Sequence, residues 1–406
     1  MEQSFPTLSV PKNKREARAL ALLGEQALPV LTYQRNRDLP STIACIIALS
    51  FIGTETALDL LTDYAHDQRS AVKTALVKAW KRFDAQVYAT RILQSRRRVR
   101  ITDPRDQIFM RKIKFLPHVQ ELHIRKGYVL RDASFLSAFP RLRTLTVDAL
   151  MQVSDLSVLS ELTNLRFLAI MRLDPATDIR WLTPLMHLTT LIMHHAPSVK
   201  DMQPLAGLTK LKKLSLVFAS TLEDLQFLAG LTELRTLDVS WTVVEDLKPL
   251  AGLMNLRVLH LQSTKVKDLK PLASLTALRF LNVSRTPVQD VEPLARCIQL
   301  RWLDLGATQV SDLGALSRLT QLYWLNVSHT QINKLNPLRN LTGMTWLELR
   351  YTQVKDLSPL RALASLKAID VYGTPQNLSI PPSLKNKIHG VPWWVRERGA
   401  NESVCW

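Results

Sequence analysis

The chain has little cysteine, little glycine and no long apolar run. Its 406 residues include three cysteines and 12 glycines. Cys45, Cys297 and Cys405 are too few and too scattered to form the disulfide framework of a secreted scaffold. The longest apolar stretch, Ile43 to Ile52, falls well short of the roughly 20 residues that a membrane-spanning helix needs. We therefore predict no transmembrane segment.

Sequence signals of secretion, catalysis and nucleotide binding are also missing. Residues 1–10 lack the basic patch and apolar run of a secretion signal, which predicts a cytoplasmic protein. No His-Glu-x-x-His, Cys-x-x-Cys or Gly-x-Ser-x-Gly motif occurs, and no glycine is followed by lysine as a Walker A loop requires. The adjacent pair His194–His195 is expected in a strand-to-turn step, where neighbours face opposite ways. We predict no enzyme, no cofactor and no metal site.

Positive charge is what the chain has in excess. The net charge is +18, and basic residues concentrate in residues 1–118. A dense cluster comprises Arg96, Arg97, Arg98, Arg100, Arg111 and Lys112. Such a cluster attracts phosphates or an acidic protein surface, so nucleic-acid or polyanion binding is one functional hypothesis. The alternative is a solvated junction between two parts of the chain.

The dominant feature of the sequence is a repeat that occurs twelve times between Val119 and Leu366. The repeats advance first by 23 residues and then by 22. Their first residues are Val119, Leu142, Leu165, Leu188, Leu211, Leu234, Leu256, Leu278, Leu300, Leu322, Met344 and Leu366. A register this regular indicates stacked structural units.

Each part of the repeat predicts a local structure. In the repeat that starts at Leu234, Leu237 and Val239 alternate with polar neighbours, which indicates a short strand with one buried face. Asp246 precedes an apolar run that contains proline, which indicates the start of a helix. The threonine that follows the strand recurs in seven repeats, and its hydroxyl is expected to satisfy backbone groups of the turn. These threonines are Thr242, Thr264, Thr286, Thr308, Thr330, Thr352 and Thr374.

This pattern resembles leucine-rich-repeat proteins, with threonine in place of the usual asparagine. The resemblance implies an α/β solenoid in which about twelve repeats stack and their strands form one curved parallel sheet. The 22-residue repeats are also similar to those of internalins and of regulatory subunits of eukaryotic protein phosphatases. Both families imply recognition of proteins through the concave sheet.

The earlier repeats differ from the later ones in a specific way. They have one extra residue between the strand and the next apolar anchor, as a comparison of Leu222 with Val244 shows. At the threonine position they hold Gly127, Leu150, Leu173, Ala196 and Ala219. We expect a turn of different shape there, and a change of curvature near Leu234 that divides the surface into two sub-sites.

Residues 13–94 are expected to be entirely helical. Apolar residues recur at helical spacing, for example at Val72, Leu76 and Trp80, in a layout that resembles HEAT-type helical pairs. Helices followed by leucine-rich repeats resemble the C-terminal half of bacterial NACHT-type proteins, here without the nucleotide-binding switch domain. This resemblance implies a sensor or adaptor in a defence or signalling system, working with a separately encoded effector.

The predicted domains follow from these segments. They are a HEAT-like helical domain (1–94), a basic junction and N-terminal cap (95–118), the solenoid (119–374), and a C-terminal cap and tail (375–406). Because an exposed terminal coil would show its leucines to water, both ends need capping. Trp393 and Trp394 in the tail belong to the cap or, alternatively, form a docking peptide.

Two columns of residues are predicted to point out of the concave face, and a third is predicted to extend this patch towards one rim. The third residue of four consecutive repeats is aromatic: Phe280, Trp302, Trp324 and Trp346. The fifth residue is often acidic: Asp238, Asp304, Glu348 and Asp370, interrupted by His260, Asn282 and Asn326. The eighth adds Trp241, Arg285, His329 and Tyr351. Aromatic anchors dominate interface energetics, so these columns suit a basic peptide with apolar side chains.

Each column also has a purely structural interpretation. The aromatic rings could stack on one another to stiffen the sheet. A second-position ladder of Arg235, Arg257, Arg279 and Arg301 could bind phosphate or merely neutralise the acidic column beside it. The acidic column argues against nucleic acid as the ligand. We therefore predict a non-enzymatic module that recognises a protein or peptide, with polyanion binding as the alternative.

Overall fold

The computed structural model describes residues 8–93, 96–101, 110–125, 130–148, 150–173, 178–196, 199 and 201–390. The chain divides into two compact units, residues 1–167 and 168–406. The predicted tail with Trp393, Trp394 and Cys405 lies outside the described residues, as does Gly127.

The N-terminal unit begins with helices, as predicted. They are α1 (Lys14–Ala21), the 3-10 helix η1 (Gly24–Leu31), α2 (Leu39–Ile52), α3 (Glu55–Tyr64), α4 (Ser70–Lys78) and α5 (Ala85–Leu93). Capping residues determine where three of these helices begin. The side chains of Asn13, Asp38 and Thr54 accept hydrogen bonds from backbone N–H groups in the first turns of α1, α2 and α3. Helix α2 is apolar on most sides because α1, α3 and α4 all pack against it.

Thirteen parallel strands follow one another in the sheet in chain order. The first three are β1 (Arg98–Ile101), β2 (Glu121–Ile124) and β3 (Thr144–Val147). The others are β4 (Phe167–Ile170), β5 (Thr190–Met193), β6 (Lys213–Ser215), β7 (Thr236–Asp238), β8 (Val258–His260), β9 (Phe280–Asn282), β10 (Trp302–Asp304), β11 (Trp324–Asn326), β12 (Trp346–Glu348) and β13 (Ala368–Asp370). Strands β2 to β13 correspond to the twelve predicted repeats.

Strand β1 is the additional strand that the repeat pattern does not contain. It precedes the first repeat, lies within the region predicted as a junction and cap, and pairs in parallel with β2. Val99 and Ile101 are buried on this strand, whereas Arg98 and Arg100 are exposed. Residues 98–101 therefore extend the sheet by one strand.

The return segments of the repeats are 3-10 helices. They are η3 (Ser134–Ala138), η4 (Ser157–Glu161), η5 (Arg180–Leu182), η6 (Gln203–Leu205), η7 (Gln226–Leu228), η8 (Lys248–Leu250), η9 (Lys270–Ser274), η10 (Glu292–Arg296), η11 (Gly314–Arg318), η12 (Asn336–Leu338), η13 (Ser358–Leu360) and, after the last strand, η14 (Pro382–Lys387). The prediction that an aspartate precedes each return helix is confirmed for Asp246 and Asp268. Asp246 Oδ1 accepts a hydrogen bond from the N–H of Lys248 at 2.9 Å, and Asp268 Oδ1 accepts one from the N–H of Lys270 at 2.8 Å. With three to six residues each, the returns are short enough for the 3-10 form.

The core of each coil is a set of buried leucines and valines. Leu237 and Val239 are both fully buried, as their alternation predicted. The threonine column is structural: Thr242 Oγ1 donates to the carbonyl of Val239 at 2.7 Å, and Thr286 Oγ1 to that of Val283 at 2.6 Å. Equivalent bonds occur at Thr264, Thr308, Thr330, Thr352 and Thr374. These hydroxyls satisfy carbonyls that water cannot reach.

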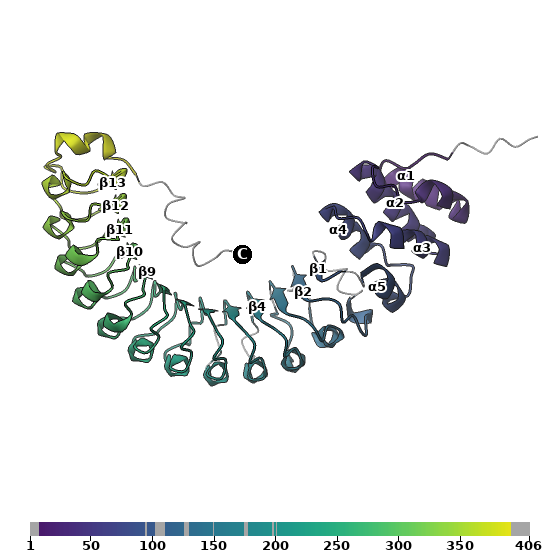
Figure 1. Cartoon of the computed structure of the whole chain (residues 1–406), viewed down its shortest axis with the longest axis horizontal. Helices are drawn as coiled ribbons and strands as arrows, with labels where there is room; N and C mark the ends of the chain where they lie inside the picture. The colour runs from purple at the N-terminus through teal and green to yellow at the C-terminus, as the bar shows by residue number, and fades with distance from the viewer. Residues whose placement is uncertain are drawn as a thin grey trace, which may run out of the picture. The chain divides into compact units, whose positions relative to one another are not determined.

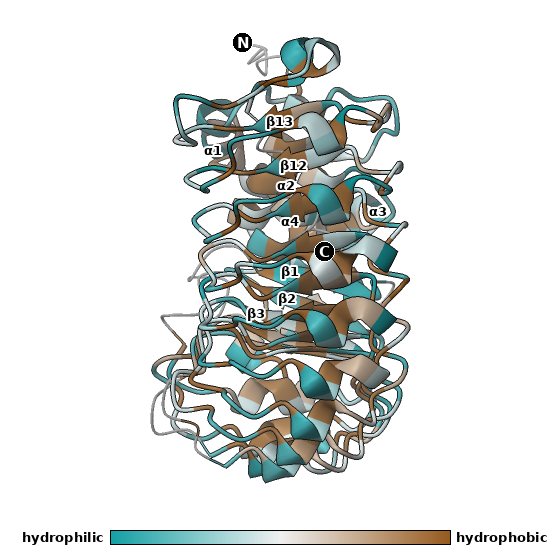
Figure 2. Cartoon of the chain, turned by 90° about the vertical axis from the view of Figure 1, so that its left-hand side faces the viewer, coloured by the Kyte–Doolittle hydropathy of each residue, from teal (hydrophilic) through white to brown (hydrophobic). Residues whose placement is uncertain are grey.

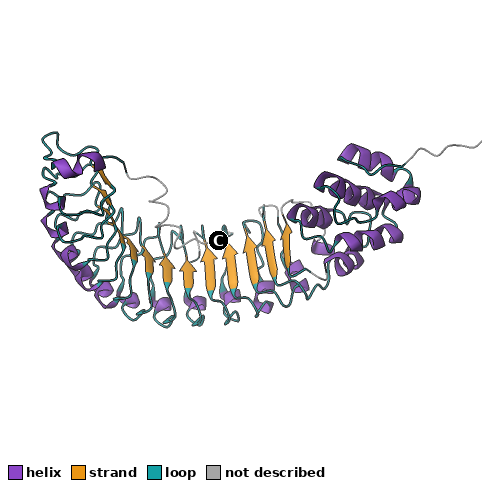
Figure 3. Ribbon diagram, turned by 45° about the horizontal axis from the view of Figure 1, so that its top comes forward, coloured by secondary structure: helices purple, strands orange, loops and turns teal. Residues whose placement is uncertain are grey.

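In the C-terminal unit the strands lie side by side along the inner, concave side of the coils, and the 3-10 helices lie on the opposite side (Figures 1 and 3). Hydrophobic and hydrophilic residues alternate in the same way in successive coils (Figure 2). Strands β4 and β5 have four residues, and strands from β6 onward have three. The predicted curvature change near Leu234 remains a prediction.

Over the described ranges, no helix is both long and apolar enough to cross a membrane.

Candidate functional site

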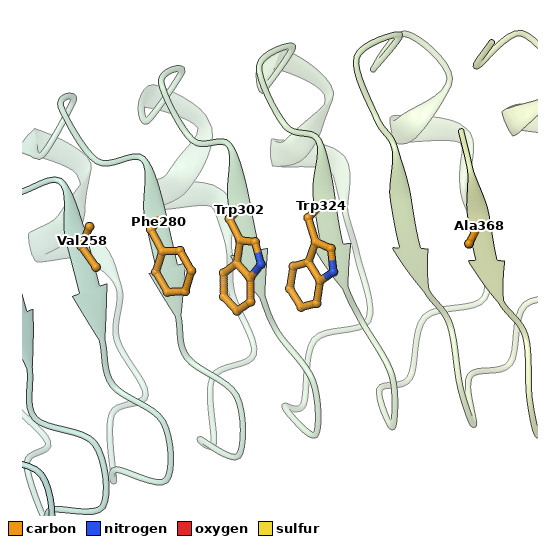
Figure 4. Close-up of a cluster of buried hydrophobic side chains, with 5 residues drawn as sticks. All are labelled: Val258, Phe280, Trp302, Trp324 and Ala368. Carbon is orange, nitrogen blue, oxygen red and sulfur yellow. The ribbon is translucent and has the colours of Figure 1, made fainter. Parts of the chain in front are cut away.

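The predicted aromatic column forms a flat stack on the strand face. Strand pairing places Trp302 beside Phe280 on one side and beside Trp324 on the other. The ring centroids of Phe280 and Trp302 are 3.9 Å apart with a 9° angle between planes, and those of Trp302 and Trp324 are 4.0 Å apart with a 2° angle. Figure 4 shows the rings in the same orientation on successive strands.

Stacking buries these rings almost completely. Phe280 is 1% exposed, Trp302 4% and Trp324 1%, while Trp346 is partly buried against the same cluster. The interpretation that these aromatic rings stack on one another is therefore confirmed. The three buried rings do not project into solvent as anchors, because their neighbours cover both faces of each ring.

The rings nevertheless border a hollow on the concave face of the C-terminal unit. Its volume is about 440 Å³. Seven predicted binding residues line it: Trp241, Phe280, Trp302, Trp324, Asp238, Asp304 and Glu348. The other four predicted residues, Trp346, Arg285, His329 and Tyr351, are not among its lining residues. The stack is thus the floor of the hollow, and carboxylates stand beside it.

The fifth column has a structural role that sequence reasoning missed. Asp304 Oδ1 accepts the N–H of Gly306 at 2.9 Å, two residues ahead, and Asn282 Oδ1 accepts that of Ser284 at 2.9 Å. The same bond occurs at Asp238, Asn326 and Asp370. Aspartate and asparagine both occur in this column because either side chain can hold the turn that ends the strand. Only the aspartates and Glu348 add charge.

Three nitrogen atoms at the hollow are buried without a hydrogen-bond partner among the described residues. They are Nε2 of His260, Nε1 of Trp302 and Nε1 of Trp324. Burial lowers the pKa of His260 below its usual value of 6.5, so its imidazole is neutral near pH 7. Buried polar groups are normally hydrogen-bonded, and an indole N–H can only donate. The two indole N–H groups are therefore unsatisfied donors just below the surface of the hollow, and a ligand with acceptor atoms pairs with them only after the rings shift.

The eighth column lies in a turn with left-handed backbone. Trp241 has φ 60°, and its N–H donates to the carbonyl of Gln262 in the next coil at 2.8 Å. Among the residues that the structure describes, seven other non-glycine residues share this conformation: His195, Phe218, Ser263, Arg285, Ala307, His329 and Tyr351. Such a backbone is unfavourable for residues with a side chain, and here the hydrogen bond to the next coil helps to hold it.

This turn column carries several exposed aromatic rings. Trp241 is 40% exposed and Tyr351 47%. Phe218 stacks between His195 at 4.5 Å and Trp241 at 5.4 Å, and His329 stacks on Tyr351 at 4.6 Å. Because Trp241 also lines the hollow, this ring is available to a partner at the edge of the site.

The second-position arginines form an exposed row. Arg235, Arg257, Arg279 and Arg301 are all exposed. Their role as a phosphate-binding ladder or as partners of the acidic column stays a prediction.

The basic cluster predicted in the N-terminal unit divides into parts with different surroundings. Arg97, Arg98 and Arg100 are exposed, whereas Arg96 is buried at 8% exposure. Arg111 is exposed elsewhere, and Lys112 Nζ lies 5.5 Å from the centre of the Trp80 ring. Arg96, Arg97, Arg98 and Arg100 line one hollow, and Arg111 and Lys112 are not among its described lining residues.

The remaining chemistry-bearing residues have structural surroundings. His194 Nε2 lies 2.8 Å from Ser215 Oγ, and His195 stacks on Phe218. Cys297 is fully buried, and burial raises the pKa of its thiol to about 11. Cys45 is also fully buried. Among the described residues, no group of three or more histidine, cysteine, aspartate or glutamate side chains could hold a metal ion.

Comparison with known proteins agrees with this architecture. Residues 255–296 match the model for leucine-rich repeats in two copies. No curated protein matches this chain in sequence. An internalin from Listeria monocytogenes is 22% identical, with a TM-score of 0.60, over 82% of this chain and 94% of that chain. A leucine-rich-repeat protein from Leptospira interrogans is 19% identical, with a TM-score of 0.58, over 71% of this chain and 74% of that chain.

A plant structure shares the fold as well. The ectodomain of the membrane receptor kinase GASSHO1/SCHENGEN3 from Arabidopsis thaliana, solved in complex with Casparian strip integrity factor 2, is 20% identical with a TM-score of 0.54. The match covers 72% of this chain and 43% of that chain. The fold is therefore a leucine-rich-repeat solenoid of the internalin-like type, preceded by helices. This architecture is typical of protein-binding modules and is usually non-enzymatic.

Proposed function

We propose that this protein recognises another protein or a peptide through the hollow on the concave face of β7 to β12. The observation that carries the proposal is the combination of buried donors and carboxylates in one hollow. His260, Trp302 and Trp324 present nitrogen atoms without a partner among the described residues, beside Asp304 and Glu348. A ligand that fits must offer both hydrogen-bond acceptors and positive charge.

An extended peptide with arginine or lysine meets both requirements. Its main-chain carbonyls accept hydrogen bonds from the indole N–H groups, and its basic side chains approach the carboxylates. The exposed ring of Trp241 then covers apolar side chains at the edge of the hollow. The Arabidopsis ectodomain, solved in complex with Casparian strip integrity factor 2, supports a recognition role for this fold.

The electrostatics of the hollow disfavour nucleic acid as its ligand. Phosphates offer acceptors but no positive charge, so Asp238, Asp304 and Glu348 would repel them. Stacking of bases also needs accessible ring faces. In this column the faces of Trp302 are covered by Phe280 and Trp324.

The biological setting is a finer proposal. Helices followed by leucine-rich repeats support a cytoplasmic sensor or adaptor whose helical region engages a separately encoded effector, as the resemblance to NACHT-type proteins implies. An ATPase or signalling enzyme recovered together with the chain from its native cell would support this setting. Recovery of ligands alone would favour a free-standing scaffold.

Affinity capture with isosteric variants tests recognition by the hollow. The full chain and a variant with Asp238→Asn and Asp304→Asn are used to capture partners from the native cell, followed by quantitative mass spectrometry. Asn282 and Asn326 already occupy this column, so asparagine should keep the turn bonds and remove only the charge. The variant should lose the specific partner, because two carboxylates of the hollow are neutral.

A matched variant on the opposite side of the coil controls for loss of charge. Asp246→Asn with Asp268→Asn removes two exposed carboxylates whose capping bonds asparagine can also make. This control should retain the partner. Equal loss from both variants, or loss from neither, contradicts recognition by the hollow.

A further inference from the structure

A second hollow lies within the N-terminal unit, where α4 faces β1, and it is strongly basic. Its volume is about 570 Å³. The residues that give it its character are Ser70, Lys73, Arg96, Arg97, Arg98 and Arg100. Glu121 is the single carboxylate among its described lining residues, and this carboxylate pairs with Arg98. The lining therefore carries a clear excess of positive charge.

Arg96 is the most unusual residue of this hollow. It is only 8% exposed, and its Nη1 donates to the carbonyl of Lys73 at 3.0 Å. Its Nε and Nη2 are buried and have no acceptor among the described residues. Burial lowers the pKa of this guanidinium, which means that its charge lacks full compensation. A buried charge of this kind is costly unless an opposite charge accompanies it.

The N-terminus of α4 adds further positive electrostatic potential to this hollow. Ser70 is the first residue of this nine-residue helix, and no side chain caps its N-terminus at Arg69. Ser70, Lys73 and Thr74 from the first turns line the hollow. Free N–H groups at a helix start carry partial positive charge and favour anions. The helix start and the buried guanidinium are independent observations that indicate the same type of ligand.

Lys73 connects these two features. Its carbonyl receives the hydrogen bond from Arg96, and its ammonium group donates to Gln68 Oε1 at 2.8 Å. An ammonium group has three donors, so this bond leaves further donors for a ligand. Lys73 thus adds a positive charge on the α4 side of the hollow, opposite the arginines of residues 96–100.

We propose that this hollow binds the phosphate group of a compact phosphorylated ligand, with the buried Arg96 as the central partner and Lys73, Arg97 and Arg100 around it. A phosphate offers several acceptor oxygens and up to two negative charges, which match a guanidinium fork and a helix start. A volume of about 570 Å³ accommodates a ligand of nucleotide size. This binding is separate from recognition by the concave hollow.

Isothermal titration of the full chain tests the site. The probes are inorganic phosphate and adenosine monophosphate, with sodium chloride at matched ionic strength as the blank. Arg97→Gln and Arg100→Gln alter exposed side chains, so the fold should be retained. Each should weaken binding of both probes roughly tenfold, because a charge-assisted hydrogen bond is lost.

Arg111→Gln is the matched control, since Arg111 is exposed and does not line the hollow. It should bind both probes as the unchanged chain does. Equal weakening by Arg111→Gln would mean diffuse electrostatic attraction and would overturn the proposal. Absence of binding by the unchanged chain would overturn it as well.

Larger phosphate carriers provide the remaining outcomes. Binding of a single-stranded RNA with a 5′-phosphate, and of vesicles that contain a phosphoinositide, is measured with the unchanged chain and the same variants. Binding of RNA or vesicles without binding of the two small probes would overturn the assignment to a compact ligand. Neither result affects capture of a protein by the concave hollow, so the two proposals can fail separately.

Discussion

Two columns of aromatic residues in the C-terminal unit differ in exposure although both form stacks. On the strand face, Trp302 and Trp324 lie parallel at 4.0 Å and are almost fully buried. In the turn, Phe218 and Trp241 stack at 5.4 Å and are 38% and 40% exposed. Strands repeat at about 4.8 Å, which lets rings on successive strands cover one another. The strand column therefore builds the floor of the hollow, and Trp241 of the turn column forms its accessible edge.

Backbone conformation explains why the turn column is informative. A left-handed backbone costs a non-glycine residue about 1–2 kcal/mol. Bulky side chains occupy it here at several coils, whereas glycine stands in it at Gly373. At Gly373 a Cβ atom would lie 2.6 Å from the ring of Tyr351, so a larger residue there would have to displace that ring. Residues held in strained backbone conformations cluster at functional sites.

The largest expected effect is on stability, when a tryptophan of either column is replaced by alanine. Trp324→Ala should lower the free energy of unfolding by about 3–5 kcal/mol, because it leaves a cavity in the stack. Trp241→Ala should lower it by less than about 1 kcal/mol, because its ring is partly exposed. Urea unfolding of both variants measures the difference. Equal losses would show that the two columns contribute alike and would break the comparison.

Titration of a buried histidine gives a smaller effect. Burial lowers the pKa of His260 below 6.5, the usual value, which the unfolded chain regains. The unfolded chain therefore binds more protons at acid pH, and the free energy of unfolding falls as pH drops below about 6.5. The fall ends once the pH passes the lowered pKa of the folded chain.

His260→Gln isolates this contribution. The variant should show a shallower loss of stability than the unchanged chain between pH 7.5 and pH 5, measured by urea unfolding at each pH. His329→Gln, a substitution in the exposed turn column, is the matched control. An unchanged pH dependence in His260→Gln would mean that this imidazole does not resist protonation in the folded chain.

The smallest effect concerns the left-handed turn itself. Ala307 has φ 55° and is exposed, so Ala307→Gly should raise the free energy of unfolding by up to about 1 kcal/mol. Ala251 is also exposed but has φ −57°, which is ordinary helical backbone. Ala251→Gly should therefore lower the free energy of unfolding by about 0.5–1 kcal/mol. Thermal unfolding compares the two. Destabilisation by both substitutions would contradict backbone strain in the turn.

Most of the fold could be predicted from the sequence because the repeat is periodic. The spacing of Leu237 and Val239 predicts a strand, and the position of Asp246 predicts the start of its return helix. Strand β1 could not be predicted in this way, since Arg98–Ile101 lies before the first repeat and lacks its pattern. Its pairing with β2 depends on the free edge that the first repeat offers.

The site was predicted less completely than the fold. Column positions correctly placed Trp302, Trp324 and Asp304 on one face, but they gave no information on burial. Exposure of a ring depends on whether its neighbours in the adjacent coils are also flat, as Phe280 is. The burial of the Arg96 guanidinium could not be predicted either, because a run of arginines gives no indication of which side chain packs against α4.

The most direct test of recognition by the concave hollow removes its indole donors and keeps its rings. A variant with Trp302→Phe and Trp324→Phe should remain folded, because Phe280 already occupies this column in the same stack. Calorimetric titration with the partner recovered by capture should show binding weakened roughly tenfold or more. Unchanged affinity in a folded variant would contradict donation of hydrogen bonds to a ligand from the floor of the hollow.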